Sequence, residues 1–169
     1  EPGGTVILSG VCLWSTGYDM YENVLIPFDG SDEGEMGARH GIELAAALGA
    51  RVHALYVIDL PGVPRALSIR DDEVSMREEY NAYGDRILDD ICAVAADHSV
   101  ECVQAKRSGS PSEEIVEYAE DEEMDVIVMG TGFRGKIGTL LGGTADKVVR
   151  TSTVPVITQR KNVNDIPER

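Results

Sequence analysis

The chain has 169 residues, a mass of 18.2 kDa and a formal net charge of −15, from 30 acidic and 15 basic side chains. This length fits one domain with a short tail and is too small for two full domains. So large a negative charge repels nucleic acid and anionic membranes, and no apolar run approaches the roughly 20 residues that span a bilayer. The composition therefore argues against a nucleic-acid-binding protein and against a membrane-spanning one.

The acidic excess is spread along the chain, and four lysines stand against eleven arginines. This composition is typical of a salt-rich cytosol, where salt screens charge repulsion within about 3 Å at 1 M. We expect a halophilic, cytoplasmic protein, the alternative being an ordinary acidic surface. The cysteines, Cys12, Cys92 and Cys102, lack C-x-x-C spacing, which argues against a zinc site or a disulfide framework. We expect Cys92 and Cys102 to pack as small apolar groups.

Residues 1–19 differ from the rest, because they show no helical period and no capping signal and contain the only tryptophan. We interpret them as an extension outside the domain, the alternative being an additional strand over 6–14. The domain is expected over 20–160, followed by a polar tail at 161–169.

Strand and helix patterns alternate from Met20 onward. The apolar run 24–28 predicts a strand, and the segment 31–50 a helix that Ser31 caps and Gly49 ends. The run 51–59 predicts a second strand. Met76, Tyr80, Tyr83, Ile87, Ile91 and Val94 then recur at the spacing of a long amphipathic helix.

A third strand is expected over 100–107. Ser110, Pro111 and Glu113 then predict a capping box that begins the next helix. The most apolar strand is expected over 124–130, and a glycine-rich loop follows it. A short helix over 145–153 and a last strand over 154–160 complete the pattern.

Strands separated by helices indicate right-handed crossovers and a parallel sheet. We therefore predict a three-layer α/β/α, Rossmann-like domain with five parallel strands in the order 3-2-1-4-5. Ligands of such sheets bind beyond the carboxyl ends of the strands, where the strand order reverses. Asp29, Val57 and the glycine-rich loop all follow or end predicted strands, so we expect them around one crevice.

The glycine-rich loop is the strongest chemical signal of the chain. Its glycines leave the backbone open beside a helix start, which suits a phosphate group, although a plain strand–helix connection or a lid is the alternative. No G-K-[ST] sequence closes it, so it is not a Walker A loop. The glycines are Gly130, Gly132, Gly135, Gly138, Gly142 and Gly143, and Thr144 follows them.

The runs VLIPFDGS, YVID and VIVMGTGFRGKIGTLLGGTADKVVR resemble the ATP-binding branch of the universal stress protein family over 20–160. The resemblance implies the adenine nucleotide alpha hydrolase-like fold. The family motif is G-x2-G-x9-G-[ST], and Gly132 and Gly142 retain its nine-residue interval. Two departures stand out: Gly130 and Gly132 are separated by one residue, and Gly143 occupies the place of the hydroxyl residue.

The resemblance implies ATP as ligand, with Mg²⁺, and nucleotide-binding roles for eight residues. It places Asp29 near the adenosine and lets the backbone of Val57 read the adenine edge. Arg134 or Lys136 could add charge near the phosphates. The eight residues are Pro27, Asp29, Val57, Gly130, Gly132, Gly142, Gly143 and Thr144.

Three function classes follow from these features. The first is a stress-response regulator, from a halophilic archaeon, that binds ATP or another adenine nucleotide and hydrolyses it weakly at most. The second is a regulatory or chaperone-like dimer that binds no nucleotide. The third, an adenine nucleotide hydrolase, lacks a visible base and nucleophile, since His40, His53 and His98 have no partner at triad or metal-ligand spacing. The apolar last strand predicts a homodimer through 154–158.

Overall fold

The computed structural model describes residues 20–59, 71–131 and 143–160. Within these ranges strands and helices alternate, and all strands join one parallel sheet in the order β3-β2-β1-β4-β5. The predicted fold class and strand order are therefore confirmed. The elements are β1 (Asn23–Pro27), α1 (Asp32–Leu48), β2 (Arg51–Ile58), α2 (Asp71–Asp97), β3 (Cys102–Ser108), α3 (Pro111–Asp121), β4 (Val126–Thr131), α4 (Gly143–Thr151) and β5 (Val156–Arg160).

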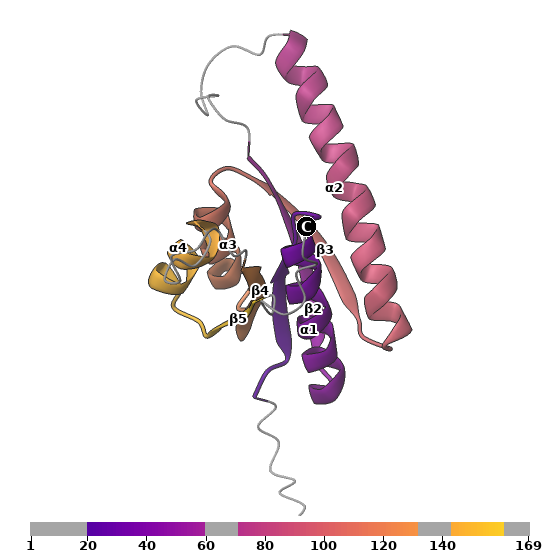
Figure 1. Ribbon diagram of the computed structural model, residues 1–169, viewed down its shortest axis with the longest axis vertical. Helices are drawn as coiled ribbons and strands as arrows, with labels where there is room; N and C mark the ends of the chain where they lie inside the picture. The colour runs from indigo at the N-terminus through magenta and orange to yellow at the C-terminus, as the bar shows by residue number, and fades with distance from the viewer. Residues whose placement is uncertain (1–19, 60–70, 132–142, 161–169) are drawn as a thin grey trace, which may run out of the picture.

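Helices cover both faces of the sheet, α1 and α2 on one face and α3 and α4 on the other (Figure 1). Alternate residues of each strand point to opposite faces. In β1, for example, Val24 and Ile26 pack with α1 and α2, whereas Leu25 packs with α3 and α4. All three side chains are fully buried, which is why the central strands read as continuous apolar runs.

The expected signals at the ends of α1 are confirmed. The Ser31 hydroxyl accepts a hydrogen bond from the Gly34 N–H at 3.0 Å, and Gly49 takes the left-handed conformation at φ 71°. At α3 the expected helix start at Pro111 is confirmed, but the capping box is wrong. The Ser110 side chain makes no cap hydrogen bond; its carbonyl instead accepts from the N–H groups of Glu113 and Glu114, both at 3.0 Å.

Cys92 and Cys102 pack against the core as expected, but the argument against a disulfide is wrong for this pair, because a disulfide joins Cys92 of α2 to Cys102 of β3. The turn between these elements, with Ser99 at φ 58°, returns the chain alongside the helix and brings the two Cα atoms within 5.4 Å. The Gln104 amide donates to Asp89 of α2 at 2.8 Å, and Lys106 pairs with Asp85 of α2. The second half of α2 is thus fastened to the edge strand β3 by a disulfide that the cysteine spacing did not indicate.

Several predictions concern residues that lie outside the described ranges. They include the interpretation of 1–19, the tail at 161–169, and the loop residues Gly132, Gly142, Arg134 and Lys136. Among the helices that the structure describes, none combines the length and the apolar character needed to cross a membrane.

Candidate functional site

The strand order places the candidate site at one edge of the sheet. β1 lies between β2 and β4. From β1 the chain adds β2 and β3 on one side, and it then crosses back to add β4 and β5 on the other side. Asp29 follows β1, Val57 lies near the end of β2, and Gly130 lies near the end of β4. Because parallel strands end at the same edge, these residues meet at the carboxyl edge of the sheet, where the strand order reverses.

The turn after β1 is tightly fixed around Asp29. One carboxylate oxygen of Asp29 accepts from the backbone N–H of Ser31 at 3.0 Å and from its hydroxyl at 2.6 Å. The Tyr83 hydroxyl of α2 donates to the Asp29 carbonyl at 3.2 Å. Gly30 takes φ 79°, and a Cβ there would overlap the Tyr83 hydroxyl. The turn thus holds an exposed carboxylate in one orientation at the edge of the sheet.

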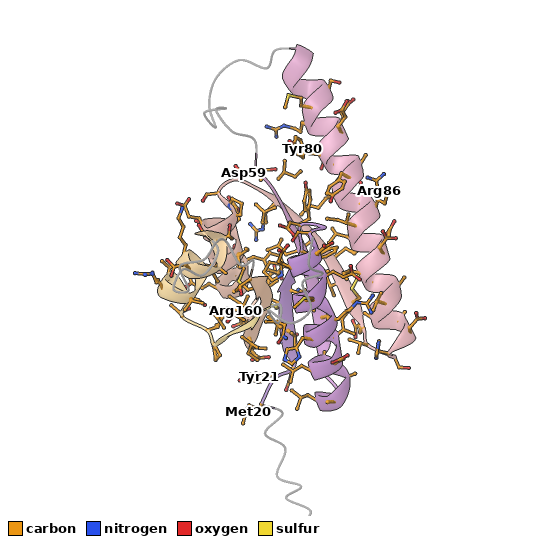
Figure 2. The ribbon with its side chains drawn as sticks, in the orientation of Figure 1. Met20, Tyr21, Asp59, Tyr80, Arg86 and Arg160 are labelled. Carbon is orange, nitrogen blue, oxygen red and sulfur yellow. A yellow bond between two sulfur atoms is a disulfide. The ribbon has the colours of Figure 1, made fainter. Side chains whose placement is uncertain are left out.

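A cavity of about 590 Å³ opens beside this turn, between the carboxyl end of β2 and α2. It contains Asp29 and Val57, two of the residues expected from sequence to bind a nucleotide. Figure 2 shows Tyr80 on the flank of α2 nearer to Asp59, at the opposite end of the molecule from Met20. The lining residues are Asp29, Tyr56, Val57, Asp59, Met76, Glu79, Tyr80, Tyr83 and Pro111.

Sequence reasoning missed most of this cavity wall. Met76 and Tyr80 belong to the apolar stripe from which we predicted a long amphipathic helix, but both are exposed large apolar side chains. Tyr83, on the same stripe, is half-buried and packs against the core. The spacing therefore predicted correctly which residues share one side of the helix. It could not predict which of them lie beyond the core.

The charged groups of the cavity wall are acidic. They are the carboxylates of Asp29, Asp59 and Glu79, and no lysine, arginine or histidine is among the described lining residues. Burial, with smaller contributions from Tyr83, Tyr80 and Asp29, raises the pKa of the Tyr56 hydroxyl above its usual value. Tyr56 therefore stays protonated at neutral pH, and the cavity offers carboxylate acceptors, a hydroxyl and aromatic surface.

Gly130, expected to cradle ribose and phosphate, has a packing reason to be glycine. A Cβ at Gly130 would overlap the carbonyl oxygen of Glu33 in α1. A Cβ at Gly37 of α1 would likewise overlap the backbone of Met129 and Gly130. These two glycines allow α1 to approach β4 closely, so the residue type at 130 does not by itself indicate a ligand.

The other described candidates lie at the same edge. Pro27 ends β1 and is half-buried beside Leu55 of β2. Gly143 and Thr144 open α4, where the first N–H groups have no partner inside the helix. A Cβ at Gly143 would meet no described atom within 4 Å, and Thr144 is exposed. The start of α4 can therefore receive an anion, although Gly143 contributes no hydroxyl.

The histidines lie away from this edge or outside the cavity wall. His53 is buried, and its Nδ1 lies 2.9 Å from the Tyr118 hydroxyl on the opposite face of β2. Burial, and next the charge of Arg51, lower the pKa of His53. His40 and His98 are exposed. In the described ranges no group of three or more His, Cys, Asp and Glu side chains could hold a metal ion.

The sequence profile of the universal stress protein family matches residues 20–160. Universal stress protein MJ0531 of Methanocaldococcus jannaschii is 34% identical over 149 residues, which cover 86% of this chain and 85% of that protein. The chain belongs to the universal stress protein family. The solved structure of MJ0577, a universal stress protein of the same organism, has a TM-score of 0.69 at 27% identity, covering 85% of this chain and 98% of that one.

More distant solved structures of this fold hold adenine nucleotides. A universal stress protein in complex with cAMP has a TM-score of 0.67 at 24% identity, covering 85% of this chain and 99% of its own. Family proteins from Arabidopsis thaliana with AMP and from Archaeoglobus fulgidus with dAMP have TM-scores of 0.63 and 0.57, at 18% and 23% identity. They cover 86% and 82% of this chain, and 95% and 98% of their own. At these identities the likeness to this chain is one of fold.

Proposed function

We propose that this universal stress protein is a stress-response regulator that binds ATP, with Mg²⁺, at the carboxyl edge of its sheet. The observation that carries the proposal is the cavity of about 590 Å³ that Asp29 and Val57 line at the carboxyl edge of the sheet, on the β2 side of the point where the strand order reverses. The adenine nucleotides bound by proteins of this fold support the same ligand class.

The two ends of the ligand meet different chemistry in this proposal. The adenosine lies in the cavity, where the Val57 backbone meets the base and the fixed Asp29 carboxylate accepts from the ribose. The phosphates lie at the start of α4, on the N–H groups of Gly143 and Thr144, with Gly130 at the same edge of the sheet. The family motif assigns the same role to Gly132 and Gly142, which lie outside the described ranges. Mg²⁺ would enter bound to the ATP and would reduce the repulsion between the phosphates and the carboxylates of the wall.

Binding of ATP is expected to be modest. Gly143 lacks the hydroxyl that the family motif places there, and one neutral hydrogen bond contributes about 0.5–1.5 kcal/mol. The site brings together no nucleophile and base among the described residues, so we propose weak hydrolysis at most. The alternative is a regulatory or chaperone-like dimer without nucleotide, and the acidic wall is the observation that favours it.

Calorimetry with ATP and MgCl2 tests the proposal on the full chain. Gly142→Val places a branched side chain against the phosphates and should abolish ATP binding. Gly143→Ser adds the missing hydroxyl at a position where the Cβ meets no described atom within 4 Å, and it should strengthen binding up to about tenfold, or about 1.4 kcal/mol. Absence of heat from the unmutated protein and from Gly143→Ser at millimolar ATP would refute ATP binding and favour the alternative.

The proposal includes assembly and environment. β5 is an edge strand with partly exposed apolar residues, Val156 and Ile157, so residues 154–158 are proposed to pair antiparallel with a second copy. Pro155 limits which backbone positions can bond across that interface. We further propose that the protein works in a salt-rich cytoplasm. Light scattering at micromolar concentration in 2 M KCl should give the mass of a dimer, and a monomer would contradict the interface.

A further inference from the structure

The sheet-facing stripe of α2 continues beyond the sheet. α2 has 27 residues and extends about 40 Å, whereas β2 has 8 residues and extends about 26 Å. Figure 1 shows the first half of α2 rising past the ends of the strands. Ile87 and Ile91, in the second half, are 7% and 3% exposed. Met76 and Tyr80 occupy the same stripe beyond the core and are 46% and 36% exposed.

The base of this overhang is rigidly attached to the candidate site. Tyr83 donates to the Asp29 carbonyl, and its ring meets the Tyr56 ring edge to face, with the centroids 5.8 Å apart. Gly84, the next residue, lies so close to the Tyr56 ring that a Cβ would overlap it. Tyr80 lies one turn further along the helix and lines the same cavity. The position of Tyr80 is therefore coupled to the turn that holds Asp29.

The charges of the wall decide which part of a nucleotide it can accept. Asp29, Asp59 and Glu79 surround the aromatic surface, and no basic side chain is among the described residues of the wall. Such a wall repels phosphate and accepts hydrogen bonds from N–H and O–H donors. The nucleoside end of an adenine nucleotide has a planar apolar face, an exocyclic amine and ribose hydroxyls, so it matches this surface.

We propose that Tyr80 and Met76, on the overhang of α2, form the surface on which the base of the bound nucleotide stacks. The ring of Tyr80 supplies a flat contact, and the thioether of Met76, one turn before it, adds a polarisable one. The overhang then adds affinity for the base from residues that are not part of the motif in the glycine-rich loop. This inference rests on the proposed function, because it concerns the same ligand.

The test compares adenosine with ATP and MgCl2 by calorimetry on the full chain. Tyr80→Leu removes the ring from an exposed position and should leave the melting temperature unchanged. Base stacking is worth about 1–3 kcal/mol, so affinity for both ligands should fall by the same factor, about 5- to 150-fold. Tyr80→Phe retains the ring and should bind within about twofold of the unmutated protein. Glu78→Ala, on the same helix outside the cavity wall, is the matched control and should also bind normally.

The outcomes separate this inference from the proposed function. Normal binding of both ligands by Tyr80→Leu would overturn the stacking surface and leave the proposed function standing. A loss confined to ATP would also overturn it, because the affected contact would then be to phosphate. Failure of the unmutated protein to bind either ligand would overturn both.

Discussion

Replacing Gly130 by alanine distinguishes two roles for this glycine. In the packing role, the added Cβ would overlap the Glu33 carbonyl of α1, and neighbouring Gly37 would meet the same strand backbone from the other side. Backbone atoms inside two packed elements move less easily than the end of a side chain. Overpacking typically costs about 1–3 kcal/mol, and contact with backbone puts Gly130→Ala near the upper value, about 3 kcal/mol.

The expected result is a lower melting temperature. One kcal/mol shifts the midpoint by about 2–4 °C in a chain of this size, so Gly130→Ala should melt about 6–12 °C below the unmutated protein. Differential scanning calorimetry in the same buffer gives the comparison. Gly143→Ala is the matched control, because its Cβ would meet no described atom within 4 Å, and it should melt within about 2 °C.

The alternative role predicts the opposite pattern. If Gly130 is glycine because a phosphate or ribose approaches it, alanine should weaken ATP binding and leave the melting temperature unchanged. A Gly130→Ala protein that melts normally would therefore refute the packing argument, whatever its affinity for ATP.

Three further predictions concern stability. Raising KCl from 0.1 to 2 M should raise the melting temperature, because screening relieves the repulsion behind a net charge of −15, and a flat or falling midpoint would contradict the high-salt interpretation. The lowered pKa of His53 means that the folded state favours the neutral imidazole. The free energy of unfolding should therefore be highest above pH 6.5, the unfolded-state pKa, and should decrease as the pH falls from there through the folded-state pKa. His53→Gln should reduce the difference between the unfolding free energies measured by urea titration at pH 7.5 and pH 5.5. An unchanged difference would refute the role of His53 in the pH dependence. Reducing the disulfide between Cys92 and Cys102, ten residues apart, should cost about 2–3 kcal/mol, and a melting temperature insensitive to dithiothreitol would refute a stabilising role.

Signals that act within one helical turn were sufficient to predict where α1 begins and ends. Ser31 and Gly49 mark the ends of α1 because a capping hydroxyl and a left-handed glycine satisfy backbone groups within a few residues. Alternation of strands and helices was sufficient for the parallel sheet. The capping box predicted at Ser110 is wrong, because the N–H groups of Glu113 and Glu114 donate to the Ser110 carbonyl and the Ser110 side chain makes no cap hydrogen bond.

Features that depend on distant neighbours could not be read from the chain. Tyr80 and Ile87 have equivalent positions in the helical spacing of α2, but of the two only Ile87 packs in the core against the sheet. The spacing of Cys92 and Cys102 carries no signature, because their approach depends on how α2 returns into β3. Gly130 looks like part of a phosphate loop, and only the position of α1 reveals its packing role.

The two ends of the proposed site depend on different parts of the chain. In the proposed site the base end is the cavity lined by Tyr56, Tyr80 and Tyr83, whose placement follows from the sheet and from α2. The phosphate end depends on the glycine-rich loop and the start of α4, where Gly143 departs from the family motif. The missing hydroxyl at Gly143 removes one phosphate contact and leaves the nucleoside contacts intact. Since the wall is acidic, every added phosphate also adds repulsion. The chain should therefore gain less affinity from the second and third phosphates than from the nucleoside itself.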